Sequence, residues 1–213
     1  MGRRKISAAY NDFIEIIGRL ERLNNENQTK FSISGTHSGP VRLSKQQLFI
    51  LTESIFFNGY RAYENFLRDI FLLYCLEKKP KTGDIVESYL KPKDFDHAES
   101  LIQSAMPFLD WSSPSNVITR SEIYLSEGFP IKTPITSNKS LLTDYKRIRN
   151  HIAHNSKESL LDYKKTLVTH LNTIPLSIPS AGEFLLMKER RNAHKYKLIT
   201  FFELMRKIAN DLT

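Results

Sequence analysis

The chain has 213 residues, with 31 lysines and arginines against 23 aspartates and glutamates, so its formal charge is +8 at pH 7. Hydrophobic residues make up 40% and charged residues 25%, which excludes a fully disordered or a collagen-like chain and is typical of a globular protein. The length favours one domain. The single cysteine, Cys75, excludes an internal disulfide and any site that needs two thiolates from one chain.

Compartment and partners follow from charge and hydropathy. No apolar run reaches the roughly 18–20 residues that a membrane span needs. The first residues, Met1-Gly-Arg-Arg-Lys5, resemble the start of a signal peptide, but no apolar segment follows them. We therefore expect a cytoplasmic protein with no membrane partner. The positive charge favours a polyanion such as nucleic acid, although charge alone is a weak argument.

In the N-terminal half, helical spacing of apolar residues predicts a first helix over 7–23. A polar loop is expected over 24–39, with a short strand at 31–34. The longest helix follows over 46–78, with Ser44 as its N-cap. Cys75 lies in an apolar stretch of this helix and is expected in the core rather than as a nucleophile.

Further along the chain, two short helices are predicted at 84–90 and 96–109, and short elements are expected within the irregular stretch 111–134. The remaining predictions are a helix over 141–154 between an N-cap at Ser140 and a stop at Asn155, a helix over 158–172, a strand at 184–187 and an amphipathic helix over 196–212. The pattern predicts an all-α fold in one domain with a long central helix.

The segment from Asp144 to His154 carries the most informative polar residues. At about 100° per residue, one face of its helix forms an apolar stripe. The residues of this stripe are Leu141, Tyr145, Ile148 and Ile152. We expect Asp144, Lys146 and Arg147 to be solvated, and His151, about 60° from the centre of the stripe, to be a half-buried packing residue.

The opposite face brings together Arg149, Asn150 and His154 around the small Ala153. These residue types suit phosphodiester cleavage. An imidazole titrates near neutral pH and moves protons, and a guanidinium stabilises charge on phosphate oxygens, while an amide orients either partner. Because one chain supplies one such histidine, a symmetric dimer would supply a second. A solvated polar face without chemistry is the alternative.

The run Arg149-Asn150-His151-Ile152-Ala153-His154 fits the R-[polar]-x-x-x-H pattern of the HEPN superfamily. The long helix before it contains Tyr63-Glu64-Asn65-Phe66-Leu67-Arg68-Asp69, and the tail contains Pro179-Ser-Ala-Gly-Glu-Phe-Leu185. With these segments, residues 46–213 resemble the RiboL-PSP-like branch of HEPN proteins. Residues 1–45, a helix and a loop, have no counterpart in that branch.

The resemblance implies a HEPN-type helical bundle that forms a homodimer, with two motif helices lining one composite cleft. It implies a metal-independent endoribonuclease, without a cofactor, that leaves 2′,3′-cyclic phosphate and 5′-hydroxyl ends. Arg149 would be the cation that stabilises the phosphate, Asn150 the orienting polar residue, and His154 the residue that transfers protons. Glu64 is a candidate helper near that cleft or, as the alternative, a surface capping or pairing residue, and His151 is a second candidate helper.

Such proteins recur as toxins and in antiphage defence, which implies an antitoxin or a defence-system partner. Two alternatives stay open. One is a catalytically silent HEPN protein that binds RNA or a partner protein. The other is a toxin held by a nucleotidyltransferase antitoxin that modifies it near the motif.

Two other patterns compete for a role. His151 and His154 lie three residues apart, a spacing that can hold a metal, but no H-E-x-x-H pattern or second His/Cys cluster supplies further ligands. The basic segment 188–197 has a composition that can track an RNA backbone, and a solvated basic turn is its alternative. Its candidate RNA-contacting residues are Lys188, Arg190, Arg191, Lys195 and Lys197.

Overall fold

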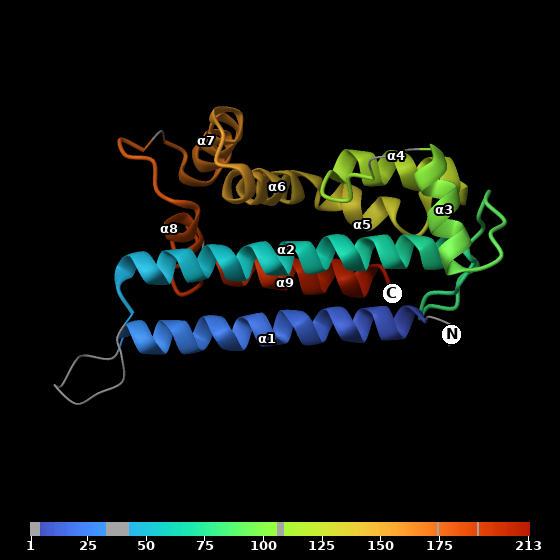
Figure 1. Ribbon diagram of the computed structural model, residues 1–213, viewed down its shortest axis with the longest axis horizontal. Helices are drawn as coiled ribbons and strands as arrows, with labels where there is room; N and C mark the ends of the chain where they lie inside the picture. The colour runs from blue at the N-terminus through green and yellow to red at the C-terminus, as the bar shows by residue number, and fades with distance from the viewer. Residues whose placement is uncertain (1–4, 33–42, 106–108, 174, 191) are drawn as a thin grey trace. The chain divides into compact units, whose positions relative to one another are not determined.

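The computed structural model describes residues 5–32, 43–105, 109–173, 175–190 and 192–213 (Figure 1). Within these ranges the chain forms nine α-helices and one short 3₁₀ helix, and no strand, which confirms the all-α prediction. The helices are α1 (Ile6–Ser32), α2 (Lys45–Cys75), α3 (Phe95–Ala105), α4 (Pro114–Tyr124), η1 (Ser126–Gly128), α5 (Lys132–Ser137), α6 (Lys139–His154), α7 (Lys157–Leu171), α8 (Ala181–Leu185) and α9 (Lys197–Asp211).

The chain divides into two compact units. Unit 1 contains the described part of Met1–Glu15 together with Ala62–Thr143 and Met205–Thr213. Unit 2 contains the described parts of Ile16–Arg61 and Asp144–Leu204. The division runs through α1, α2, α6 and α9, so each unit takes one part of these helices. The two units are groups of residues that pack together and do not test domain boundaries along the chain. The predicted boundary after residue 45 therefore stays a prediction.

Aromatic side chains form the core of unit 2. The ring of Phe201 on α9 lies 4.6 Å from that of Phe56 on α2 and 5.0 Å from that of Tyr145 on α6. Gly59 on α2 lets α9 come close, because a Cβ there would lie 3.1 Å from Cε1 of Phe201. The one glycine of the long helix therefore marks a helix contact. Phe56 and Phe201 are fully buried, so this cluster fixes α6 against α2 and α9 through apolar burial.

Unit 1 has its own core around the second half of α2. Phe66 stacks on Phe13 of α1, with the ring centroids 4.8 Å apart, and Phe71 packs edge-on against Trp111 at 5.2 Å. The buried Tyr74 donates a hydrogen bond to the carbonyl of Leu212. Cys75 is buried, and burial raises the pKa of its thiol to about 12, so its prediction as a core residue is confirmed.

The expected loop after the first helix is wrong in its first part, because α1 continues to Ser32. Asn24 and Asn27, whose polarity indicated a loop, lie on this helix and are buried. Phe31 and Ser32 are helical, so the strand prediction also fails there. The rest of the predicted strand and loop, over 33–39, lies outside the described residues.

Two further local predictions are wrong. Residues 84–90 form no helix, because their backbone N–H groups bond to other segments: Ser88 donates to Oε1 of Glu77 and Tyr89 to the carbonyl of Tyr124. The predicted strand at 184–187 is wrong, because its first two residues end the short helix α8 and its last two lie in a turn. Ser180 caps α8, and its hydroxyl accepts from the N–H of Glu183 at 3.1 Å.

Other predictions are confirmed. The stretch 111–134 holds α4, η1 and the start of α5. Asn155 adopts a φ of 43° and donates its N–H to the carbonyl of His151, which ends α6 as expected.

The prediction of Ser140 as the N-cap is wrong, because this residue lies inside α6. The first backbone hydrogen bond of the helix runs from the N–H of Leu142 to the carbonyl of Asn138. In the described ranges, no helix has both the length and the apolar character that crossing a membrane requires.

Candidate functional site

Helix α6 carries the motif, and unit 2 contains its part from Asp144 onward. Tyr145 and Ile148 are 3% and 0% exposed, as the apolar stripe predicts. At the start of the helix the buried residue is Leu142, whereas Leu141 is exposed, which corrects that member of the stripe. Ile152 is half-buried. The stripe therefore holds over the part of α6 that belongs to unit 2.

The predicted polar face brings together two of its three residues. Arg149 is half-buried and donates from Nη1 to Oδ1 of Asn150 at 3.2 Å. The guanidinium also lies 5.6 Å from the ring centre of Phe57 on α2, a cation–π distance. His154, the last residue of α6, is exposed, as is Ala153. An oriented guanidinium and a solvent-facing imidazole thus occupy the last turns of one helix.

His151 has the packing role that its position predicts. Its ring stacks on the ring of Tyr163 from α7, and the residue is half-buried. Burial lowers the pKa of His151 below its ordinary value, while the charge of Glu53 acts in the opposite direction. Within the part of the chain that the structure describes, the buried Nδ1 of His151 has no hydrogen-bond partner. The ring therefore acts as a neutral packing surface.

Asp144 corrects the prediction of a solvated residue, because it is 3% exposed. Its Oδ1 accepts from Thr166 on α7 at 3.1 Å and from Arg147 at 3.0 Å. Nε2 of His170, one turn further along α7, lies 3.4 Å from Oδ2. Burial alone would raise the pKa of this carboxyl, but His170, Thr166 and Arg147 together lower it. Asp144 is thus a charged link between α6 and α7.

The sequence contained a signal for this link. Asp144 lies only about 40° from Ile148 on the helical wheel, which places it beside the apolar stripe. A carboxylate there requires hydrogen-bond partners from whatever covers the stripe. Thr166 donates a hydrogen bond to the carboxylate and His170 lies within ion-pair distance of it. Their spacing of four residues puts both on one face of α7.

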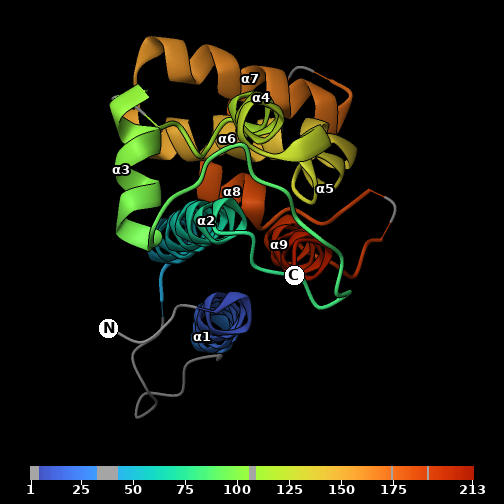
Figure 2. The ribbon, with the colours of Figure 1, turned by 90° about the vertical axis from the view of Figure 1, so that its right-hand side faces the viewer.

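The short helix α8 braces the same region of unit 2 (Figure 2). The backbone N–H of Gly182 donates to Oε1 of Glu53 on α2 at 2.8 Å. A Cβ on Gly182 would lie 2.2 Å from the carbonyl oxygen of Phe49, so only glycine permits this approach. The hydroxyl of Tyr163 lies 3.2 Å from the carbonyl oxygens of Pro179 and Ser180 and donates to them. The residues around His151 therefore belong to a rigid, hydrogen-bonded frame.

The basic segment divides into exposed and engaged cations. Lys188 and Arg190 are exposed, and Arg191 lies outside the described residues. Lys195 pairs with Glu203 at 2.8 Å. Lys197 is 3% exposed, pairs with Glu189 at 3.0 Å and lies over the ring of Phe184. The prediction of Lys197 as a solvent-facing RNA contact is therefore wrong, because its ammonium is buried in a structural ion pair.

Glu64 lies half-buried on the part of α2 that belongs to unit 1, whereas the motif belongs to unit 2. Its role as a helper stays a prediction.

Among the described residues, no group of three or more His, Cys, Asp or Glu side chains is placed to hold a metal ion. His151 and His154 differ in burial, since one stacks inside the unit and the other faces solvent.

Neither protein-family models, nor curated proteins, nor solved structures match this chain. The motif and its geometry are therefore what indicates a function. A guanidinium held by an amide, followed by an exposed imidazole on the same helix, can bind a phosphodiester and exchange a proton with it.

Proposed function

We propose that the chain is a HEPN-type endoribonuclease of the RiboL-PSP-like branch, acting as a toxin or defence effector on RNA in the cytoplasm. The observation that supports this most is the arrangement on α6, where Arg149 is bonded to Asn150 and His154 faces solvent. The buried side of the same helix is fixed by Tyr145 and Ile148. The polar groups are thus presented from a rigid element, as catalysis requires.

The proposed reaction needs no metal. The 2′-hydroxyl of a ribose attacks the adjacent phosphorus and loses its proton to a neutral His154. The 5′-oxygen of the next nucleotide leaves and takes a proton from a protonated imidazole. The products are a 2′,3′-cyclic phosphate and a 5′-hydroxyl. Arg149 stabilises the charge that develops on the phosphoryl oxygens, and Asn150 holds the guanidinium in orientation.

Two imidazoles in opposite protonation states serve this reaction better than one. A two-fold homodimer would bring His154 of each chain to one cleft, with the contact made by the same surface on both copies. The small, exposed Ala153 between the polar groups leaves space for a second helix to approach. An antitoxin or defence-system partner belongs to the same proposal, since an active ribonuclease must be restrained in its host.

The test is RNA cleavage by the purified wild type in the presence of EDTA. The expected result is cleavage that survives the chelator and leaves cyclic-phosphate ends, while RNA with hydrogen in place of the 2′-hydroxyl at the cut site resists. Cleavage that stops with EDTA and returns with a divalent ion would support the metal alternative through His151 and His154. Binding of RNA without any cleavage would support the catalytically silent alternative.

A further inference from the structure

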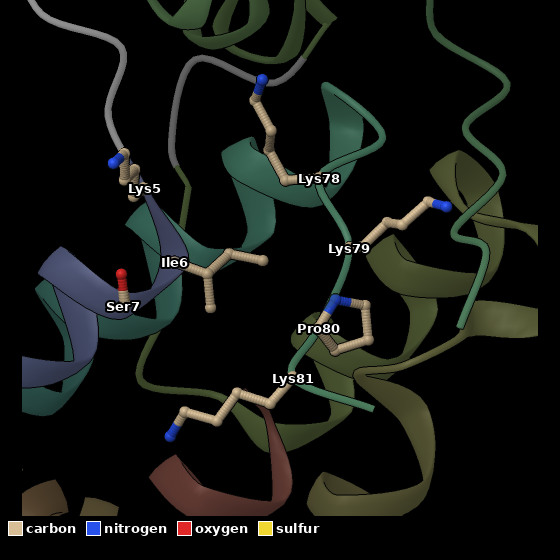
Figure 3. Close-up of a pocket in the computed structure, with 7 residues that line it drawn as sticks. All are labelled: Lys5, Ile6, Ser7, Lys78, Lys79, Pro80 and Lys81. Carbon is tan, nitrogen blue, oxygen red and sulfur yellow. The ribbon is translucent and has the colours of Figure 1, made fainter. Parts of the chain in front are cut away.

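Unit 1 contains a pocket of about 330 Å³ between the start of α1 and the segment that follows α2 (Figure 3). Buried Ile6 and Pro80 give it an apolar lining. Four lysines surround it and no lining residue is acidic; they are Lys5, Lys78, Lys79 and Lys81. This volume is at the lower end of the range for small ligand pockets, about 300–1,000 Å³.

The four lysines of the pocket are not paired with carboxylates in the part of the chain that the structure describes. No acidic residue of the described ranges forms an ion pair with any of the four lysines. Glu77, the nearest acid on the same segment, pairs instead with Lys91 at 2.5 Å and accepts from the N–H of Ser88. The ammonium of Lys81 lies 4.0 Å from the ring centre of Tyr10, against an aromatic face rather than a carboxylate.

The backbone around the pocket does not form a compact phosphate cradle. Such cradles aim several consecutive N–H groups at one anion. Here the N–H of Lys78 donates to Leu73, that of Lys81 to Thr213 and that of Gly83 to Pro80. Figure 3 shows the nitrogen ends of Lys78, Lys79 and Lys81 pointing in different directions around the pocket. Recognition therefore depends on separate, flexible charges, which suit an extended chain of phosphates better than one compact polyphosphate group.

We propose that this lysine pocket is a second RNA-contacting site, which holds the backbone of a single strand apart from the motif. The lysines neutralise successive phosphates, and the apolar surface of Ile6 and Pro80 accepts a base or ribose. The inference rests on the proposed function only in naming RNA as the ligand. The pocket lies in unit 1 and the motif in unit 2, so binding here is separable from cleavage.

The experiment measures binding of a single-stranded 2′-O-methyl oligoribonucleotide, which has no free 2′-hydroxyl and cannot be cleaved, by fluorescence anisotropy over a series of salt concentrations. The triple variant Lys5→Gln/Lys78→Gln/Lys81→Gln is compared with a control of equal charge change, Lys139→Gln/Lys157→Gln/Lys164→Gln, built from exposed lysines elsewhere. Each phosphate contact contributes about 0.7 to the slope of log affinity against log salt for a single strand. The pocket variant should lose about 2 from this slope, and the control should keep it.

The wild type should also bind longer oligonucleotides more tightly, because more phosphates reach the lysines. Equal slopes in the pocket variant and the wild type would overturn the proposal, as would equal losses in both triple variants, which would indicate net charge alone. Full competition by pyrophosphate, with no gain from oligonucleotide length, would assign a compact anion instead and overturn it as well. If circular dichroism shows that the triple variant does not fold, the single Lys78→Gln variant gives the same test. Its slope of log affinity against log salt should fall by about 0.7.

The two proposals fail separately. A wild type that binds the oligonucleotide through the pocket but never cleaves RNA removes the proposed function and keeps this inference. A wild type that cleaves RNA with unchanged binding in the pocket variant does the reverse.

Discussion

The imidazole ring of His151 lies parallel to the phenol ring of Tyr163, with the ring centroids 4.7 Å apart and the planes inclined by 12°. This contact joins the motif helix to α7. It also separates two histidines that the sequence places three residues apart, since His151 is held inside unit 2 and His154 faces solvent. Their different surroundings give His151 a packing role and leave the imidazole of His154 accessible for the proton transfer that the proposed function requires.

The first prediction follows from that separation. His154→Ala should lower the rate of RNA cleavage by about 10²–10⁴-fold, the usual effect of losing a general acid–base group. Arg149→Ala should cost roughly 10²–10³-fold, and Arg149→Lys should also fail substantially, because an ammonium lacks the planar set of donors that Asn150 orients. Single-turnover cleavage and survival of expressing cells are the measurements.

The matched control is His194→Ala, which removes another exposed imidazole of unit 2. It should cleave RNA like the wild type. The His154→Ala and His194→Ala proteins should keep the melting temperature of the wild type, because both side chains are exposed. A folded His154→Ala protein with wild-type activity, beside a folded but inactive His151→Ala protein, would contradict the assignment of roles.

The second prediction concerns pH. Burial lowers the pKa of His151 in the folded protein, so between its ordinary value near 6.5 and the lower folded value the unfolded chain binds more protons. The free energy of unfolding should therefore fall as the pH drops below about 6.5. His151→Phe keeps a ring against Tyr163 and removes the titrating group, so its urea-unfolding curves should show a weaker dependence between pH 7 and pH 5. An identical pH dependence in the two proteins would contradict this account.

The third prediction concerns the link between α6 and α7. Removing one member of a buried ionic network typically costs about 3–5 kcal/mol, because the remaining partners lose their compensation. Asp144→Ala should approach the lower end of this range, since Arg147 is partly solvated. Thr166→Val should cost about 1 kcal/mol, as it removes one hydrogen bond to Oδ1. Urea denaturation of the two variants measures both losses.

The same link predicts acid sensitivity. The partners of Asp144 lower its pKa despite burial. The carboxylate therefore stabilises the folded protein above pH 3.8, the ordinary pKa of the unfolded chain, and this stabilisation is lost as the pH falls through the lower pKa of the folded state. Asp144→Asn should therefore remove part of the acid-induced loss of stability below pH 4. If the free energy of unfolding of Asp144→Asn depends on pH as steeply as that of the wild type below pH 4, the carboxylate does not contribute to the acid sensitivity.

The sequence predicted the helical class and most helices because apolar spacing is repeated over many residues in α2, α6 and α9. It failed where tertiary contacts decide a short segment. Asn24 and Asn27 look like loop residues but are buried on a helix. Ser88 looks helical, but its N–H is satisfied by Glu77 from a distant turn. Local patterns do not contain these partners.

The candidate site shows the same limit. The exposed His154 and half-buried His151 agree with the wheel, since both depend only on the face of one helix. The ion pair of Lys197 with Glu189 depends on a chain reversal between them, where Lys188 and Tyr196 form an isolated bridge. The composition of that segment indicates a basic surface, but its geometry buries one of the cations.

The last prediction tests the frame around His151 through Gly182. Alanine there would place a Cβ 2.2 Å from the carbonyl oxygen of Phe49, a backbone atom that cannot rotate away. The helix α8 would have to move, and the hydrogen bond from Gly182 to Glu53 would weaken with it. We expect Gly182→Ala to lower the free energy of unfolding by about 3 kcal/mol, the upper part of the usual range for overpacking.

The comparison variant is Gly83→Ala, where a Cβ meets no atom within 4 Å and only the φ of 82° opposes the change. Its cost should stay near 1 kcal/mol. A second test separates backbone from side-chain crowding, because adding Phe49→Ala to Gly182→Ala leaves the carbonyl in place. The double variant should therefore recover no stability over Gly182→Ala. Recovery would mean that the ring of Phe49, rather than its backbone, limits the approach of α8.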